Sequence, residues 1–187
     1  KFPIRDDKGK LGKYCDLSKL FFVIWTTTPW TIPGNMAISL NAGFDYVLLQ
    51  VPNGEVYIMA QELAEGVCKK AGIDYAACTV LATLKGGEFE LMTAKHPLLD
   101  QDSVILNGDH VTLEAGSGCV HTAPGFGAED FDVCTRYNTA GLTHIEITVP
   151  VNAKGVMTDA RYKGQYYAKG NDMVVSDLEA EGFLVAK

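Results

Sequence analysis

The feature that most restricts the fold of this chain is a series of short strand-like segments that turn signals separate. The clearest pair is 45–51 (DYVLLQV) and 55–59 (EVYIM), which an Asn53-Gly54 turn connects. Apolar segments on either side of Asn-Gly are typical of a β-hairpin, because both turn residues tolerate positive φ angles. Further strands are predicted at 20–24, 78–84, 88–92, 103–107, 110–115 and 144–151, with a short one inside 116–125.

Helices are predicted in the intervals between these strands. In segment 60–72, apolar residues recur at helical spacing and a glycine ends the pattern. Segment 127–138 has acidic residues in its first turn, and segment 171–182 begins with Asn171, a suitable N-cap. Since strands and helices do not alternate regularly, the expected fold is mixed and β-rich. We expect a β-barrel core with peripheral α-helices.

Composition narrows the class of protein. The chain has 187 residues, 47% of them hydrophobic and 21% charged, which is enough for one domain with a sizeable core. No run of 18 apolar residues occurs, so neither a membrane span nor a signal peptide is expected. The chain does not open with an initiator methionine, which suggests a domain excised from a longer protein.

Charge and cysteine usage restrict the partners and the compartment. A net charge of −7 argues against a broad nucleic-acid surface but leaves room for contact with one or two nucleotides. The five cysteines form no CxxC pair, and their number is odd. Free thiols in a reducing cytoplasm are therefore expected.

Several common catalytic motifs are absent. The GxG at 116–118 is not followed by the third glycine of a dinucleotide site, because His121 stands there, and neither GK[ST] nor GxSxG occurs. His144 and Glu146 match half of a zinc-deaminase motif, but no cysteine follows Cys134 to complete it. No second ligand pair accompanies Cys119 and His121, so no metal site is predicted.

Two segments remain, WTTTPWTIPGN (25–35) and GSGCVHTAPGFGAEDF (116–131). Together they resemble the editing (CP1) domain of class I aminoacyl-tRNA synthetases, and the isoleucyl type matches best. That type reads WTTTPWT, as residues 25–31 do, whereas valyl and leucyl types carry an arginine and an acid at Thr28 and Trp30. The second family motif is GTG-x-V-H-x-APGFG-x-x-D, and here Ser117 replaces its threonine.

The resemblance implies a fold, a reaction and partners. Residues 1–187 would form a single editing domain of the valyl/isoleucyl/leucyl type, since the synthetic motifs HxGH and KMSKS are absent. The implied reaction is hydrolysis of valyl-tRNA(Ile), with valyl-adenylate as a further candidate substrate. The implied partners are the tRNA 3′ end, the valine moiety and the rest of the synthetase. No cofactor is expected here, because ATP and magnesium belong to the synthetic domain.

The resemblance also assigns roles to residues. Thr26, Thr27 and Thr28 would offer hydroxyls to the ester, the attacking water and the terminal ribose. Asp130 would pair with the α-ammonium group, while His121 would form a wall of the side-chain pocket. Trp30 would lie beside the terminal adenosine. The remaining substrate-binding candidates are Thr31, Asn35, Gly125 and Phe126.

Other interpretations remain open from the residues alone. The threonine segment could be a strand-to-loop corner, His121 a core histidine, and Asp130 a helix-capping acid with Glu129 and Asp132 as competitors. The chain could also be a non-catalytic module that binds the tRNA 3′ end, or an editing domain of the valyl or leucyl type. Thr28 and Trp30 disfavour the last alternative.

Overall fold

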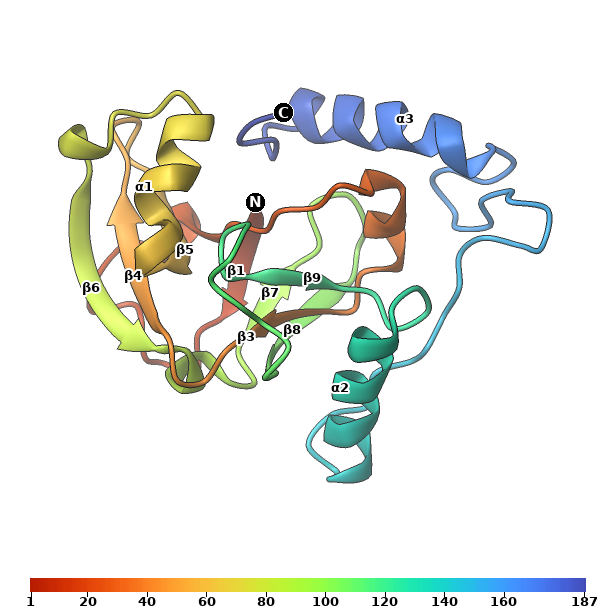
Figure 1. Ribbon diagram of the computed structural model, residues 1–187, viewed down its shortest axis with the longest axis horizontal. Helices are drawn as coiled ribbons and strands as arrows, with labels where there is room; N and C mark the ends of the chain where they lie inside the picture. Colours follow the sequence, from red (N-terminus) through yellow and green to blue (C-terminus); the bar gives the residue numbers. More distant parts are fainter.

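The apolar segments of the chain pair into one nine-stranded sheet with the order β6-β4-β5-β2-β1-β7-β8-β3-β9. The computed structural model describes all 187 residues (Figure 1). The strands are β1 (Phe2–Asp6), β2 (Leu20–Phe22), β3 (Ala37–Leu40), β4 (Asp45–Gln50), β5 (Val56–Ala60), β6 (Thr79–Lys85), β7 (Thr93–Lys95), β8 (Asp102–Asn107) and β9 (Val120–Thr122). The α-helices are α1 (Gln61–Lys70), α2 (Ala128–Thr139) and α3 (Tyr167–Ala180), and a 3-10 helix, η2, spans Pro29–Gly34.

The sheet is mostly antiparallel and strongly curved. The predicted hairpin forms β4 and β5, with Leu48 opposite Ile58, and its turn has Gly54 at a φ of 88°. Two pairs are parallel, β2 with β5 and β3 with β8. At the far edge, an isolated bridge joins Val120 of β9 to Trp25, just beyond β2.

The sheet therefore bends back toward its own middle without closing. The expected β-rich class with peripheral helices is confirmed, but the edge strands β6 and β9 do not pair, so the core is an open curved sheet rather than a closed barrel. Closure would require a continuous hydrogen-bonded ladder between the edges, and a single bridge is not one.

Apolar side chains fill both faces of this sheet. The larger core cluster has 16 buried residues, including Phe22, Ile38 and Leu48. Helix α1 covers the other face through Ala64 and Cys68. Burial of these side chains stabilises the sheet at about 25 cal/mol per Å² of apolar surface removed from water.

The other two helices lie at the periphery (Figure 1). Helix α2 packs through Val133, Cys134 and Tyr137 against Ala37 and Leu106. Helix α3 runs above η2 and buries Val174 and Leu178 against Ile32. Helix α2 begins inside the glycine-rich motif, and Ile32 belongs to the threonine-rich segment, so these two contacts hold both motifs in place.

Three predicted strands are wrong. Segment 88–92 turns through a 3-10 helix (Gly86–Phe89) and a left-handed Leu91 with a φ of 61°. Segments 110–115 and 144–151 form no named strand. In 144–151 the amide side chain of Asn138 bonds both the N–H and the carbonyl of Ile145, so a side chain replaces the neighbouring strand.

The predicted cap of the last helix is also wrong. Helix α3 begins at Tyr167, so Asn171 lies inside it. Its side-chain oxygen instead accepts the backbone N–H of Trp30 at 3.1 Å. The residue therefore connects α3 to η2 rather than capping the start of the helix.

No helix has both the length and the apolarity that a membrane crossing demands. All five cysteines are free thiols, and Cys68, Cys119 and Cys134 are buried.

Candidate functional site

The threonine-rich segment and the glycine-rich motif meet at a cleft of about 310 Å³. β9 carries the second motif alongside β3, with His121 opposite Ile38, and the chain then turns into α2. The bridge between Trp25 and Val120 holds the start of the threonine segment beside β9. Of the predicted site residues, those lining the cleft are Thr26, Thr28, Trp30, Thr31, His121, Phe126 and Asp130.

The threonine loop is braced by its own hydroxyls. Thr26 Oγ1 accepts the backbone N–H of Thr28 at 3.0 Å and lies 3.3 Å from the Thr28 hydroxyl. Pro29 opens η2 immediately afterwards and Pro33 lies within it. The fixed φ angles of proline restrict this backbone, so the hydroxyls of Thr26 and Thr28 are held at the cleft.

Thr27 is placed differently from its two neighbours. Its side chain is exposed and does not line the cleft, and no hydrogen bond of its hydroxyl is formed within the protein. Thr27 lies at a bend, and the hydrogen bonds between Thr26 and Thr28 bring the hydroxyls of those two residues together without it.

His121 is held by hydrogen bonds on both ring nitrogens. Its Nε2 lies 3.0 Å from Thr31 Oγ1, and that hydroxyl donates to the carbonyl of Thr28 at 2.9 Å. The single proton of Thr31 is thereby used, so Nε2 must carry the ring proton. The other nitrogen, Nδ1, accepts the Asn35 amide at 2.8 Å. The neutral Nε2–H tautomer follows from these partners.

Burial agrees with that protonation state. It lowers the pKa of His121 to about 4, with a smaller contribution from nearby His96. The imidazole is therefore neutral at physiological pH, and it acts as an oriented ring rather than as a charge. A neutral ring fixed on two sides is a suitable rigid wall for a small side-chain pocket.

Asn35 lies behind His121, not in the cleft. It is fully buried, and its amide also donates to the carbonyl of Ala37 at 2.9 Å. Its side-chain oxygen accepts the hydroxyl of Ser103. The structure thus makes Asn35 a support of His121, whereas the sequence placed it among the groups that touch substrate.

Asp130 lies in the first turn of α2, where the helix dipole favours a negative charge. Its Oδ2 accepts the backbone N–H of Ala123 at 2.9 Å. Burial raises the pKa of its carboxyl, an effect that the Ala123 N–H and the charge of His110 oppose. Its competitors Glu129 and Asp132 are exposed and line no part of the cleft.

An aromatic cluster forms the side of the cleft next to α3. The ring of Trp30 contacts Phe126 edge-to-face at 5.0 Å between centroids and Tyr167 at the same distance. Gly34 lies beneath it, where a Cβ would come within 2.7 Å of the Phe126 ring. The half-buried Trp30 therefore has a fixed position and one side turned to the cleft.

Gly125 allows a close approach between two segments of the backbone. A Cβ at this position would lie 2.1 Å from the carbonyl oxygen of Thr148, and the residue does not line the cleft. The glycine lets the turn between β9 and α2 press against the 144–151 segment. This is a physical reason that the motif alone did not reveal.

Trp25 also lines the cleft, although it was not among the site residues predicted from the sequence. The side chain is 51% exposed, lines the cleft, and has the ammonium group of Lys70 6.0 Å from its ring centroid. A tryptophan after an apolar strand is usually buried, so no sequence pattern distinguishes this exposed one.

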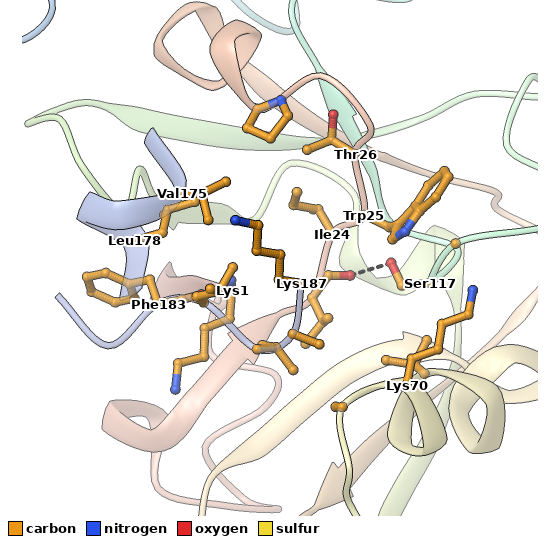
Figure 2. Close-up of a pocket in the computed structure, with 18 of the residues that line it drawn as sticks. Lys1, Ile24, Trp25, Thr26, Lys70, Ser117, Val175, Leu178, Phe183 and Lys187 are labelled. Carbon is orange, nitrogen blue, oxygen red and sulfur yellow. Dashed lines mark hydrogen bonds between the residues drawn. The ribbon is translucent and has the colours of Figure 1, made fainter. Parts of the chain in front are cut away.

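A second, apolar cleft of about 250 Å³ lies on the other side of the threonine loop. Figure 2 shows it between α3, the C-terminal residues and Lys70 of α1, with Ser117 bonded to the carbonyl of Val23. Trp25 and Thr26 line both clefts and separate them. No acidic or histidine side chain lines the second cleft, whereas His121 and Asp130 line the first.

Cys119 and His121, which are two positions apart, lie in different surroundings. Cys119 packs in the large core cluster, where burial raises the pKa of its thiol, while His121 lines the cleft. No three His, Cys, Asp or Glu side chains cluster as metal ligands anywhere in the chain.

Comparison of the sequence with known proteins identifies close relatives, although no protein-family model matches it. The chain is 48% identical over 191 aligned residues to an isoleucine–tRNA ligase of Caldanaerobacter subterraneus and 46% identical over 188 to one of Caldicellulosiruptor bescii. These alignments cover 100% and 99% of the chain. They cover 19% and 20% of the relatives, so the chain spans about a fifth of their length.

Comparison of folds identifies similar solved structures. The CP1 domain of a leucyl-tRNA synthetase (GlLeuRS-CP1) superposes with a TM-score of 0.71 at 15% identity, covering 87% of this chain and 82% of that domain. The editing domain of the Plasmodium knowlesi cytosolic leucyl-tRNA synthetase gives 0.69 at 14% identity, covering 88% and 84%. The fold is that of these domains.

Proposed function

Because the chain is homologous over its whole length to isoleucine–tRNA ligases and has the fold of the leucyl editing domains, we propose that residues 1–187 form a single editing domain. Its reaction is hydrolysis of the ester in valyl-tRNA(Ile), with valyl-adenylate as a further substrate. The observation that carries the proposal is the meeting of Thr28, His121 and Asp130 at one cleft from distant parts of the sequence.

The need for such a reaction is physical. A pocket that binds isoleucine gains only about 0.8 kcal/mol per buried methylene over valine. Isoleucine–tRNA ligases are the standard case in which this difference is too small and a second, hydrolytic site removes the wrong product. That site must accept valine and exclude isoleucine by size.

The residues of the cleft suit the parts of an aminoacyl ester. The carboxylate of Asp130 pairs with the free α-ammonium group, which distinguishes an aminoacyl ester from an ordinary one. The neutral ring of His121, held by Thr31 and Asn35, limits the length of the side chain. The Trp30 ring lies beside the terminal adenosine, since stacking on an aromatic needs no base-specific contact.

The chemical step relies on positioned hydroxyls. Thr26 and Thr28 orient water toward the ester carbonyl and bond the oxyanion that forms there. Water adds to the carbonyl carbon, the bond to the ribose oxygen breaks, and the products are valine and free tRNA. No strong general base faces the cleft, so the neighbouring ribose hydroxyl assists the proton transfer. Thr27 has no direct role in this scheme.

The reaction consumes only water, so we assign ATP and magnesium to a synthetic domain outside this chain. The partners proposed are the 3′ end of tRNA(Ile), the valine moiety and the remainder of a synthetase. The net charge of −7 supports weak tRNA binding by the chain itself. The cytoplasm, where translation occurs and thiols stay reduced, is the proposed compartment.

The proposal is tested by incubating the chain with valyl-, isoleucyl- and threonyl-tRNA and measuring deacylation of each. Preferential hydrolysis of valyl-tRNA(Ile) is expected. Binding of all three without hydrolysis would instead identify a non-catalytic module for the tRNA 3′ end. Preference for threonyl-tRNA would indicate an editing domain of the valyl type.

A further inference from the structure

The hydrogen bonds behind the cleft form one continuous chain that begins at Ser103 in β8. The Ser103 hydroxyl donates to the side-chain oxygen of Asn35, and the Asn35 amide donates to Nδ1 of His121. His121 Nε2 then donates to Thr31, and Thr31 donates to the carbonyl of Thr28. This series of hydrogen bonds runs from β8, the neighbour of β3 in the sheet, to the threonine loop.

The donor and the acceptor of each of these hydrogen bonds are determined by two backbone carbonyls, which can only accept. The carbonyl of Ala37 accepts from Asn35, so the amide nitrogen must face Ala37 and His121. The Asn35 oxygen must then face Ser103, whose hydroxyl is its only hydrogen-bond partner. At the other end, the Thr28 carbonyl accepts from Thr31, which leaves Thr31 to accept from His121.

We propose that Ser103 is a positioning residue for the candidate site, which holds the Asn35 amide and through it the orientation and tautomer of His121. This proposal rests on the function proposed above for its kinetic consequences but not for its structural ones. Ser103 touches no part of the cleft and is fully buried.

Loss of the hydroxyl has a defined consequence. In Ser103→Ala the buried oxygen of Asn35 has no partner, and an unsatisfied buried polar group is unfavourable. The amide then turns or shifts, Nδ1 of His121 loses its donor, and the ring samples the Nδ1–H form. In that form Nε2 can only accept, so it competes with the Thr28 carbonyl for the Thr31 proton.

The protein contains a matched control for Ser103. Ser39 in β3 is also fully buried, and its hydroxyl lies 2.7 Å from the hydroxyl of Thr122. Ser39→Ala therefore removes a buried hydroxyl of the same kind from the adjacent strand without touching Asn35 or His121. Any general loosening of the sheet affects both variants alike.

The experiment compares wild type, Ser103→Ala, Ser103→Thr and Ser39→Ala. The ring nitrogens of His121 are observed by ¹H–¹⁵N NMR of the folded chain, together with deacylation of valyl- and isoleucyl-tRNA(Ile). We expect a single Nε2–H tautomer in wild type and Ser39→Ala, and mixed tautomers in Ser103→Ala. The ratio of valyl to isoleucyl hydrolysis should fall by about threefold or more in Ser103→Ala, the effect of one lost hydrogen bond. Ser103→Thr, which keeps the hydroxyl, should restore the wild-type tautomer.

Two results would overturn the proposal. One is an unchanged tautomer in Ser103→Ala, and the other is an equal change in Ser39→Ala. If wild type itself hydrolyses no valyl-tRNA, the proposed function fails, and the NMR comparison still decides whether Ser103 positions His121.

Discussion

The backbone N–H of Ala123 bonds one oxygen of Asp130, and no other hydrogen bond or ion pair of the protein reaches this carboxylate. Oδ2 is thereby anchored between β9 and α2, while Oδ1 is free to bind a cation in the cleft. The geometry suits a carboxylate that must hold its position and still offer an acceptor to an ammonium group.

The charge of Asp130 should be essential for turnover. Asp130→Asn keeps an oxygen for the Ala123 N–H but removes the charge opposite the α-ammonium group. We expect kcat/KM for valyl-tRNA to fall by roughly 30-fold or more, since losing one partner of a desolvated charge pair costs about 2 kcal/mol or more. Steady-state deacylation measures it, with the exposed Asp132→Asn as control. Equal rates for wild type and Asp130→Asn would remove Asp130 from the site.

The same substitution should stabilise the fold at neutral pH. Burial raises the pKa of Asp130, so the folded state keeps its proton to higher pH than the unfolded state does. The free energy of unfolding therefore decreases as pH rises from the pKa of Asp130 in the unfolded state to its higher pKa in the folded state. This loss of stability persists at pH 7. Asp130→Asn should melt above wild type at pH 7, with a difference that shrinks toward pH 4. A constant difference across that range would contradict this assignment.

The threonines should contribute unequally. Thr28 lines the cleft and Thr27 does not. Thr28→Val keeps the shape but deletes the hydroxyl, so we expect kcat for valyl-tRNA to fall roughly tenfold or more with little change in KM, because donors aimed at the transition state act on the chemical step. Thr27→Val should stay near wild type. A larger fall in kcat for Thr27→Val than for Thr28→Val would show that Thr27, and not Thr28, acts on the ester.

Removal of the His121 ring should relax the size limit. Fitting an extra methylene against a rigid wall costs typically about 1–3 kcal/mol, so His121→Ala should hydrolyse isoleucyl-tRNA roughly tenfold faster than wild type while still cleaving valyl-tRNA. Deacylation of both esters is measured side by side, with the exposed His144→Ala as control. If the variant hydrolyses isoleucyl-tRNA no faster than wild type does, another residue limits the size of the side-chain pocket. Thr31 and Trp30 are the next candidates.

His121 should also make the protein sensitive to acid. Burial lowers its pKa from 6.5 to about 4, so below pH 6.5 the unfolded state binds a proton that the folded state does not. Stability should therefore fall as pH decreases from about 6.5 to about 4. His121→Gln should lose less melting temperature than wild type between pH 7 and pH 5. His96, whose pKa burial also lowers to about 4, remains in both proteins. If the melting temperatures of wild type and His121→Gln fall in parallel as pH decreases, His121 does not contribute to the acid sensitivity.

Local patterns were sufficient for much of the fold and for the identity of the site. The Asn-Gly hairpin, α1, α2 and the strand of the second motif all depend on short-range turn geometry and apolar periodicity. The two motifs also indicated most of the residues that line the cleft, because a peptide motif records which side chains occur together. These features are properties of neighbouring residues.

Other features depended on partners far away in the sequence, and only the tertiary structure decided them. Segment 144–151 has the composition of a strand, but Asn138 takes the hydrogen bonds of Ile145 that a strand would need. Thr27 is separated from Thr28 by the direction in which each side chain leaves the backbone. Asn35 supports His121 because Ser103, 68 positions away, holds the other end of its amide. Propensity describes a residue alone, whereas a hydrogen bond requires two groups that only folding brings together.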